Sequence, residues 1–164
     1  MGIFMELIIL KGKPGHGKTT TLMLLHNKLV SENSKFEWIV QMRSRRVDVE
    51  KPQDFISVYD FMGGRIAIIS SGDEAHYVEK AMSNVIANHH PDIIIVCMHT
   101  RNYPNSSNRM LHEKYRDLLK KENIFDTVYT SDKSNKIEVK YPLVEIIYQH
   151  IVKIIKTIDH ENKN

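Results

Sequence analysis

GKPGHGKT, at residues 12–19, fits the pattern G-x-x-x-x-G-K-[ST] at every fixed position. The apolar run at residues 7–10 (LIIL) comes shortly before it and is typical of a buried strand. Residues 20–25 (TTLMLL) follow it and are typical of the start of a helix. A strand, a glycine-rich loop and a helix in this order are the setting in which this pattern binds phosphate. The stretch therefore predicts an α/β fold with a nucleoside triphosphate site.

The residue types in the loop suit a triphosphate, which carries several negative charges in a small volume. Gly12, Gly15 and Gly17 allow backbone N–H groups to point inward, because glycine has no Cβ and tolerates a positive φ. We expect Lys18 to reach the β- and γ-phosphates and the Thr19 hydroxyl to hold Mg²⁺. The residues expected to bind nucleotide are Gly12, Lys13, Pro14, Gly15, His16, Gly17, Lys18, Thr19 and Thr20, with no separate role for His16, which occupies a freely variable position.

The composition constrains the size of the domain and its location. Its 164 residues, 41% hydrophobic and 26% charged, are enough for one domain with a core, which we expect to cover residues 1–158 and to leave a frayed tail at 159–164. No apolar run approaches the roughly 20 residues that span a bilayer. Residues 7–10 are too short for a signal peptide. The single cysteine, Cys97, suits a reducing compartment. We therefore expect a cytoplasmic protein without membrane contact.

The net charge gives little information about partners. A value of +3 is mildly basic and falls short of a nucleic-acid signature, so nucleic acid stays open as a partner. Arg43-Ser44-Arg45-Arg46 is the one dense cluster of charge. A solvated loop is the preferred interpretation of this cluster, and a contact with phosphate or with a partner is the alternative. A protein partner or a second copy of the chain also stays open.

Strand and helix patterns alternate along the chain and predict an α/β/α sandwich with a mainly parallel sheet. A hairpin around Met62-Gly63-Gly64 adds an antiparallel strand. The expected strands cover residues 6–10, 36–42, 55–61, 65–69, 92–98 and 125–130, and the expected helices cover 18–30, 74–89 and 108–122. Pro142 is expected to open a last helix whose core stripe is Leu143, Ile146, Ile147, Ile151, Ile154, Ile155 and Ile158.

A second group of polar residues is expected near the metal, at the end of a strand beside the one that leads into the loop. Two apolar strands compete for that place, and only the one followed by residues 70–74 (SSGDE) offers an acid. We expect Asp73 to join the metal shell, directly or through a bound water, with Ser70 as a further participant. Glu74 is the candidate that orients an attacking water. The alternative for Asp73 is a cap of the helix that follows, and one residue can do both.

The other strand ends at Thr100 and Arg101 and continues into a polar loop. Arginine near a γ-phosphate stabilises the charge that develops there, and a mobile loop could close over it. We therefore expect Arg101 to contact phosphate or substrate, with Arg109 a weaker candidate and Arg116 a surface residue. The Thr100 side chain is placed to sense the γ-phosphate.

With these motifs, the chain resembles the P-loop NTPase superfamily. The resemblance implies a three-layer α/β/α fold, Mg-ATP or Mg-GTP, and cleavage at the β–γ bond. The guanine-reading motif N-K-x-D is absent, because residues 130–134 read TSDKS, and this favours ATP over GTP. The order of strands, Ser-x-Gly-Asp and Cys-x-x-Thr-Arg is also similar to that of small uncharacterised bacterial ATP-binding proteins.

Three functions remain open at this point. The first is a small ATPase that drives or switches a partner. The second is a P-loop kinase that transfers the γ-phosphoryl group to a small molecule such as a nucleoside or nucleotide, with Asp48 and Glu50 as weak candidates for the acceptor site. The third is a nucleotide-dependent regulatory module with little turnover. ATPase activity is the preferred expectation.

Overall fold

A computed structural model gives the fold of the chain. It describes residues 5–13, 17–32, 34–39, 53–70, 74–127 and 136–162, with side chains from 140 to 158 in the last range. The strands in these ranges are β1 (Glu6–Lys11), β2 (Lys35–Trp38), β3 (Ile56–Phe61), β4 (Gly64–Ile69), β5 (Ile93–Met98) and β6 (Ile124–Asp126). The helices are α1 (Lys18–Ser31), α2 (Ala75–His89), α3 (Ser107–Lys114) and α4 (Lys136–Asn162), with short 3₁₀ turns at Arg116–Leu118 and Lys121–Asn123.

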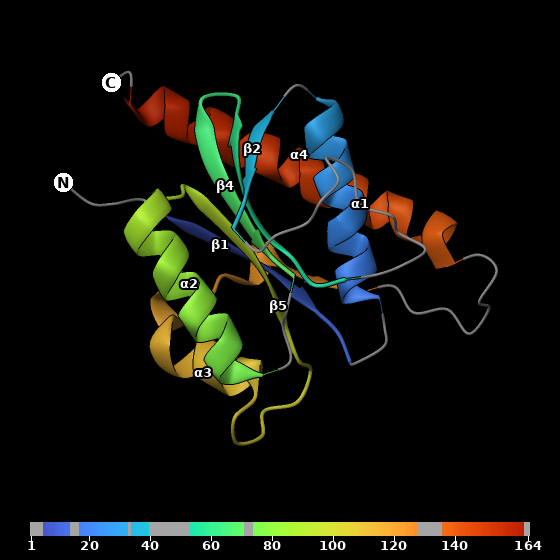
Figure 1. Ribbon diagram of the computed structural model, residues 1–164, viewed down its shortest axis with the longest axis vertical. Helices are drawn as coiled ribbons and strands as arrows, with labels where there is room; N and C mark the ends of the chain where they lie inside the picture. Colours follow the sequence, from blue (N-terminus) through green and yellow to red (C-terminus); the bar gives the residue numbers. More distant parts are fainter. Residues whose placement is uncertain are drawn as a thin grey trace.

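The strands form one six-stranded sheet in the order β2-β3-β4-β5-β1-β6 (Figure 1). β1 lies next to the edge strand β6 and pairs in parallel with it and with β5, where Glu6 lies opposite Ile93. β4 pairs in parallel with β5, whereas β3 is antiparallel to both β4 and β2. The expectation of a mainly parallel sheet with a reversed strand from a hairpin is confirmed. The loop of residues 12–19 follows the carboxyl end of β1, where ligands of such sheets bind.

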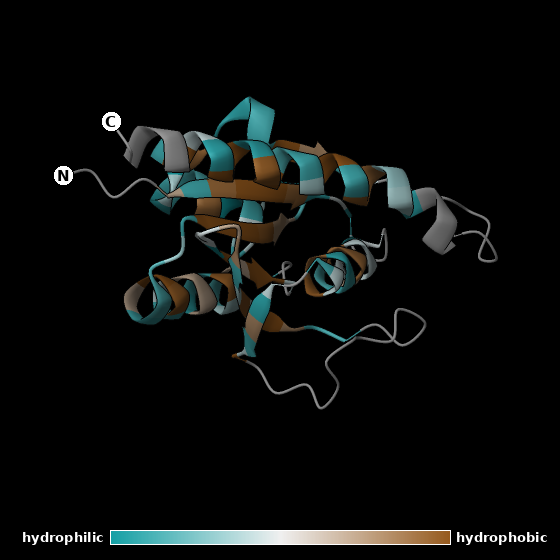
Figure 2. Cartoon of the chain, turned by 90° about the horizontal axis from the view of Figure 1, so that it is seen from above, coloured by the Kyte–Doolittle hydropathy of each residue, from teal (hydrophilic) through white to brown (hydrophobic). Residues whose placement is uncertain are grey.

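Two apolar cores lie on the two faces of the sheet. Alternate residues of each central strand point to opposite faces, so Ile8 and Leu10 pack under α1 and α4, and Leu7 and Ile9 pack under α2 and α3. Figure 2 shows the mostly hydrophobic strands inside helices that carry hydrophilic residues. This arrangement is the expected α/β/α sandwich. Within the ranges described, no helix is both long enough and apolar enough to cross a membrane.

The hairpin between β3 and β4 turns through two residues, Met62 and Gly63. Both have a positive φ, 53° and 83° respectively. A two-residue loop with positive φ at both positions matches the right-handed twist of the strands that it joins. The expected hairpin is therefore confirmed, and it fixes β3 as the reversed strand of the sheet.

Two expectations about helices are wrong. α3 ends at Lys114 rather than at residue 122, and two 3₁₀ turns follow. Lys120 and Asn123 both bond the Glu6 carboxylate at the start of β1, and these contacts hold the chain beside the sheet on its way into β6. α4 begins at Lys136, so Pro142 lies inside the helix instead of opening it. Proline removes one backbone donor there, and the packing of the helix against the sheet compensates.

The core stripe of α4 is partly as expected. Leu143, Ile147, Ile151 and Ile155 are buried, and Ile154 and Ile158 are half-buried. Ile146 is 55% exposed, and Val144 takes its place in the core. Ile147 lies three residues after Val144 and four before Ile151, so it faces the sheet with them. Ile146 comes one residue earlier and therefore lies off that row. The helix continues to Asn162.

Candidate functional site: a phosphate loop at the sheet edge

The loop after β1 begins at a glycine held between two neighbouring strands. The Gly12 N–H donates to the Met98 carbonyl at the end of β5, at 3.1 Å. A Cβ on Gly12 would lie 2.3 Å from the Thr127 hydroxyl oxygen, which follows β6. Only glycine fits between these strands without displacing Thr127. The loop therefore leaves the sheet at a fixed point.

The loop ends at Gly17, the N-cap of α1. Its φ of 82° lies in the left-handed region, which favours glycine. The Gly17 carbonyl accepts from both the backbone N–H and the hydroxyl of Thr21, at 2.9 and 2.8 Å. The first turn of α1 holds no acidic residue, so its unpaired N–H groups and its positive dipole end meet no carboxylate of their own turn. This is the local arrangement that suits an anion.

Lys18 begins α1 and is turned into the loop. Its side chain is 7% exposed, and its ammonium group donates to the Gly12 carbonyl at 2.7 Å. The cation therefore reaches back across the mouth of the loop. Lys13 is exposed and Thr20 is half-buried on α1, whereas Pro14, Gly15 and His16 lie outside the described residues.

Thr19 lies beside a carboxylate that sequence reasoning missed. The Thr19 hydroxyl donates to Asp54 Oδ1 at 3.2 Å, just before the start of β3. Ser70, at the end of β4, also contacts this oxygen, at 3.5 Å, and its hydroxyl accepts from the Phe55 N–H at 2.7 Å. Ser70 is buried, whereas Asp54 is exposed. Three oxygen-bearing side chains, those of Thr19, Asp54 and Ser70, thus meet at the first turn of α1.

Asp54 reaches this edge because β3 runs against its neighbours. The carboxyl ends of β1, β4 and β5 lie at one edge of the sheet, and a reversed strand begins where its parallel neighbours end. A search for acids that follow strands passes over a residue that precedes one. The signal was present in the sequence: the Met62-Gly63 hairpin reverses β3, and Asp54 stands directly before the apolar run that begins at Phe55.

The strand beside β1 is β5, and β4 lies one strand further out. The strand that precedes Asp73 in the sequence, β4, is therefore not the neighbour of β1, and the expectation that it lies beside the loop strand is wrong. Asp73 lies outside the described residues. The N-cap of α2 is Glu74, whose side chain makes no capping bond; its carboxylate is exposed and lies 3.8 Å from His76 Nδ1. No contact in the described part of the chain joins Glu74 to Thr19 or Lys18.

The loop after β5 is anchored at both ends. Ser107 and Asn108 bond the backbone of His99, and His99 Nδ1 accepts from the Arg101 N–H at 3.0 Å. Thr100 Oγ1 is buried at the strand tip, and among the residues that the structure describes it has no hydrogen-bond partner. This orphaned hydroxyl leaves capacity for a ligand oxygen.

Of the three arginines in this region, Arg101 and Arg116 are exposed and Arg109 is half-buried. The Arg101 side chain is exposed, and within the described ranges nothing holds its guanidinium group. Arg109 donates to Asn102 at 3.0 Å on the protein surface. Arg116 is exposed on a 3₁₀ turn, as expected. The cluster at residues 43–46, and Asp48 and Glu50, lie outside the described residues.

The donor set suits Mg²⁺ bound with phosphate. Mg²⁺ takes hard oxygen ligands, and in phosphate sites it uses one or two protein oxygens together with phosphate and water. The Thr19 hydroxyl and the Asp54 carboxylate are such oxygens, and they lie beside Lys18 and the start of α1.

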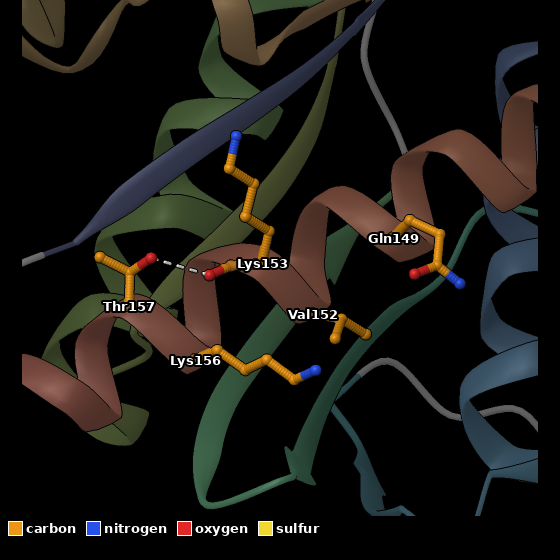
Figure 3. Close-up of a pocket in the computed structure, with 5 residues that line it drawn as sticks. All are labelled: Gln149, Val152, Lys153, Lys156 and Thr157. Atoms are coloured by element: carbon orange, nitrogen blue, oxygen red, sulfur yellow. Dashed lines mark hydrogen bonds between the residues drawn. The ribbon is translucent and has the colours of Figure 1, made fainter.

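A separate hollow lies along the carboxyl-terminal half of α4 (Figure 3). It is open to solvent and is lined by Gln149, Val152, Lys153, Lys156 and Thr157. None of the predicted site residues that the structure describes lines it. The hollow is therefore distinct from the loop at the sheet edge.

Comparison with known families agrees with this geometry. The family model described as Novel STAND NTPase 3 matches residues 5–143, from β1 into the first turns of α4. No curated protein and no solved structure matches the chain. The matched region contains the loop, the first turn of α1 and the whole sheet. Because the family model matches well more than half of the chain, the chain belongs to the Novel STAND NTPase 3 family.

Proposed function

We propose that this protein binds a Mg²⁺-nucleoside triphosphate, ATP in preference to GTP, and hydrolyses its β–γ bond. The observation that carries the proposal is the pairing of Lys18 and Thr19 at the start of α1, with the ammonium turned into the loop and the hydroxyl beside Asp54. Membership of an NTPase family supports the same reaction.

Each side chain has a distinct role in this proposal. Lys18 exchanges the Gly12 carbonyl for β- and γ-phosphate oxygens and offsets their charge. Thr19 and Asp54 hold Mg²⁺ or its water shell, and Mg²⁺ supplies further charge neutralisation at the phosphates. Thr100 Oγ1 donates to a γ-phosphate oxygen. Gly12 and Gly17 let the backbone approach the phosphates.

The acids and the arginine predicted from the sequence complete the proposal. We keep Asp73 as a second metal-shell residue, Glu74 as the group that orients water and Arg101 as a phosphate contact. Glu74 and Arg101 are exposed in this structure, and we propose that both turn toward the nucleotide when it binds. The buried Cys97 suits a reducing compartment, and we propose a cytoplasmic location.

The test is turnover with Mg-ATP alone. Free phosphate and ADP are followed for the wild type, for Lys18→Ala and for Lys153→Ala as a control that removes an exposed lysine of α4. We expect steady phosphate release that Lys18→Ala abolishes and Lys153→Ala retains. ATP that is bound but not cleaved would contradict the ATPase. Cleavage that then needs an added nucleoside would indicate a kinase, and binding without cleavage a regulatory module.

A further inference from the structure

α4 presents a lysine where its buried row calls for an apolar residue. Val144, Ile147, Ile151 and Ile155 follow one another at helical spacing and are buried against the sheet and α1. Lys140 precedes Val144 by one turn, lies on the same row and is only 3% exposed. Lysine is rarely buried to this extent. Its position at the end of the row therefore points to a role other than core packing.

The end of the Lys140 side chain lies against the phosphate loop. A Cβ on Gly17 would be 2.4 Å from Lys140 Cε and 2.5 Å from its Nζ. The Lys140 ammonium group thus lies directly over Gly17, the N-cap residue of α1. The next residue is Lys18, whose own ammonium group is turned into the loop. Two lysines from two helices therefore converge on one loop.

This concentration of positive charge suits a polyanion. Lysine binds phosphate as a point charge, and this attraction is stronger where water is excluded than at an exposed site. Here the ammonium also faces the positive end of the α1 dipole, and the first turn of α1 carries no acid. A triphosphate is the anion that the loop is proposed to take, and it carries enough charge for both lysines.

We propose that Lys140 is a second phosphate-binding lysine, supplied to the nucleotide site by α4. Its ammonium group contacts phosphate oxygens of the bound nucleotide beside the first turn of α1. The inference rests on the proposed function, because it names a further residue of the same site. It also makes the placement of α4 part of nucleotide binding, so that the two helices on this face of the sheet close around one ligand.

Three variants separate phosphate binding from packing. Lys140→Met keeps an unbranched stem and removes the ammonium group, and Lys140→Arg keeps the charge. Lys153→Met is the matched control, since it removes a charge from the exposed hollow of the same helix (Figure 3). Affinity for ATP is measured by titration calorimetry in Mg²⁺ buffer, and stability without nucleotide is measured by urea unfolding.

We expect Lys140→Met to weaken ATP binding by about 10- to 100-fold, the range for one charge-assisted hydrogen bond. Lys140→Arg should recover most of the affinity, and Lys153→Met should match the wild type. Urea unfolding without nucleotide shows whether Lys140→Met keeps the wild-type fold, so that a loss of ATP affinity is assigned to the missing ammonium group and not to unfolding.

The outcomes that overturn the inference differ from those that overturn the proposed function. Wild-type affinity in Lys140→Met, whether or not its urea midpoint falls, shows that the lysine only supports the fold and overturns the inference alone. The proposed function then stands if Lys18→Ala still abolishes ATP binding. A wild-type protein that does not bind ATP overturns both.

Discussion

Asp54 is the side chain on which the proposed metal site depends most. It is exposed, yet its carboxylate oxygen accepts a hydrogen bond from the Thr19 hydroxyl and lies within hydrogen-bond reach of Ser70. Replacing it with asparagine keeps the size and the hydrogen-bonding oxygen and removes the charge. Because Asp54 is at the surface of the fold, we expect a change in unfolding free energy within about 0.5 kcal/mol.

Asp54→Asn is therefore expected to lower Mg²⁺-dependent turnover by about 10- to 100-fold, as loss of a metal-supporting carboxylate does. The measurement is the phosphate release rate as a function of Mg²⁺ concentration, which should move to higher Mg²⁺ in the variant. Asp73→Asn is run beside it. If Asp73→Asn shifts the Mg²⁺ dependence and Asp54→Asn does not, the metal carboxylate is Asp73 and the assignment of Asp54 is wrong.

Tyr59 carries a second prediction at the scale of single residues. It is fully buried on β3, where its hydroxyl accepts from Ser57 at 2.6 Å and bonds His26 Nδ1 on α1. Tyr59→Phe leaves Ser57 without this acceptor and removes one of the contacts of His26. We expect a loss of about 1–3 kcal/mol in the free energy of unfolding at pH 7. Urea titration measures it, and an unchanged midpoint would show that the hydroxyl network contributes nothing.

Burial also raises the pKa of Tyr59 well above its ordinary 10.0, against the opposing effect of the Ser57 hydrogen bond. Above pH 10 the unfolded chain therefore ionises at this position before the folded one, and stability falls as pH rises. Between pH 10 and 11 the wild type should lose about 1 kcal/mol more than Tyr59→Phe, and above pH 11 the difference should approach about 1.4 kcal/mol per pH unit. Equal slopes in the two proteins would place Tyr59 in contact with water.

At the scale of elements, the β3–β4 hairpin matters because it brings Asp54 to the site. Met62 adopts a φ of 53°, which residues with a Cβ rarely adopt. Asparagine tolerates this region better, and Asn-Gly is the preferred pair for such a turn. Met62→Asn should therefore raise the free energy of unfolding by about 0.5–1 kcal/mol.

Gly63→Ala is the opposite test of the same turn. A Cβ on Gly63 would meet nothing within 4 Å, so the cost comes from its φ of 83° alone. We expect a loss of about 1–2 kcal/mol, read from the same urea titrations. A gain from Gly63→Ala, or a loss from Met62→Asn, would show that the turn differs in solution.

The elements also show what sequence patterns could and could not predict. The loop, the hairpin and the buried β5 follow from local spacing and were predicted. Asp54 was missed because its place depends on the direction of β3 within the sheet, which is a tertiary property. The length of α3 was overestimated because contacts of Lys120 and Asn123 with Glu6 override helical periodicity.

Lys140 shows the same limit on the other face of the sheet. Its spacing from Val144, Ile147 and Ile151 places it on the buried row of α4, but the expectation that Pro142 opens the helix left it outside. Proline in a first turn is common, and tertiary packing is what allows a helix to continue through it here. The meeting of Lys140 with Gly17 could not be read from local spacing at all.

At the scale of the whole molecule, the described residues that we assign to nucleotide binding lie at one edge of the sheet, while both cores share β1, β4 and β5. A ligand that joins α1, β3 and α4 at that edge therefore stabilises elements that belong to the same cooperative unit. Nucleotide binding should appear as a shift of global unfolding, because a ligand that binds only the folded state adds its binding free energy to stability.

Mg-ATP at 100 times its Kd adds about 2.7 kcal/mol to stability and should raise Tm by about 5–10 °C for a chain of this size. Thermal unfolding with Mg²⁺ alone, Mg-ATP and Mg-GTP at equal concentrations measures this shift, and GTP should give the smaller one. Lys18→Ala should abolish the nucleotide shift, because its charge is the one turned into the loop. If Lys18→Ala retained the full shift, the nucleotide would bind elsewhere on the molecule, and the open hollow along α4 would be the next place to test.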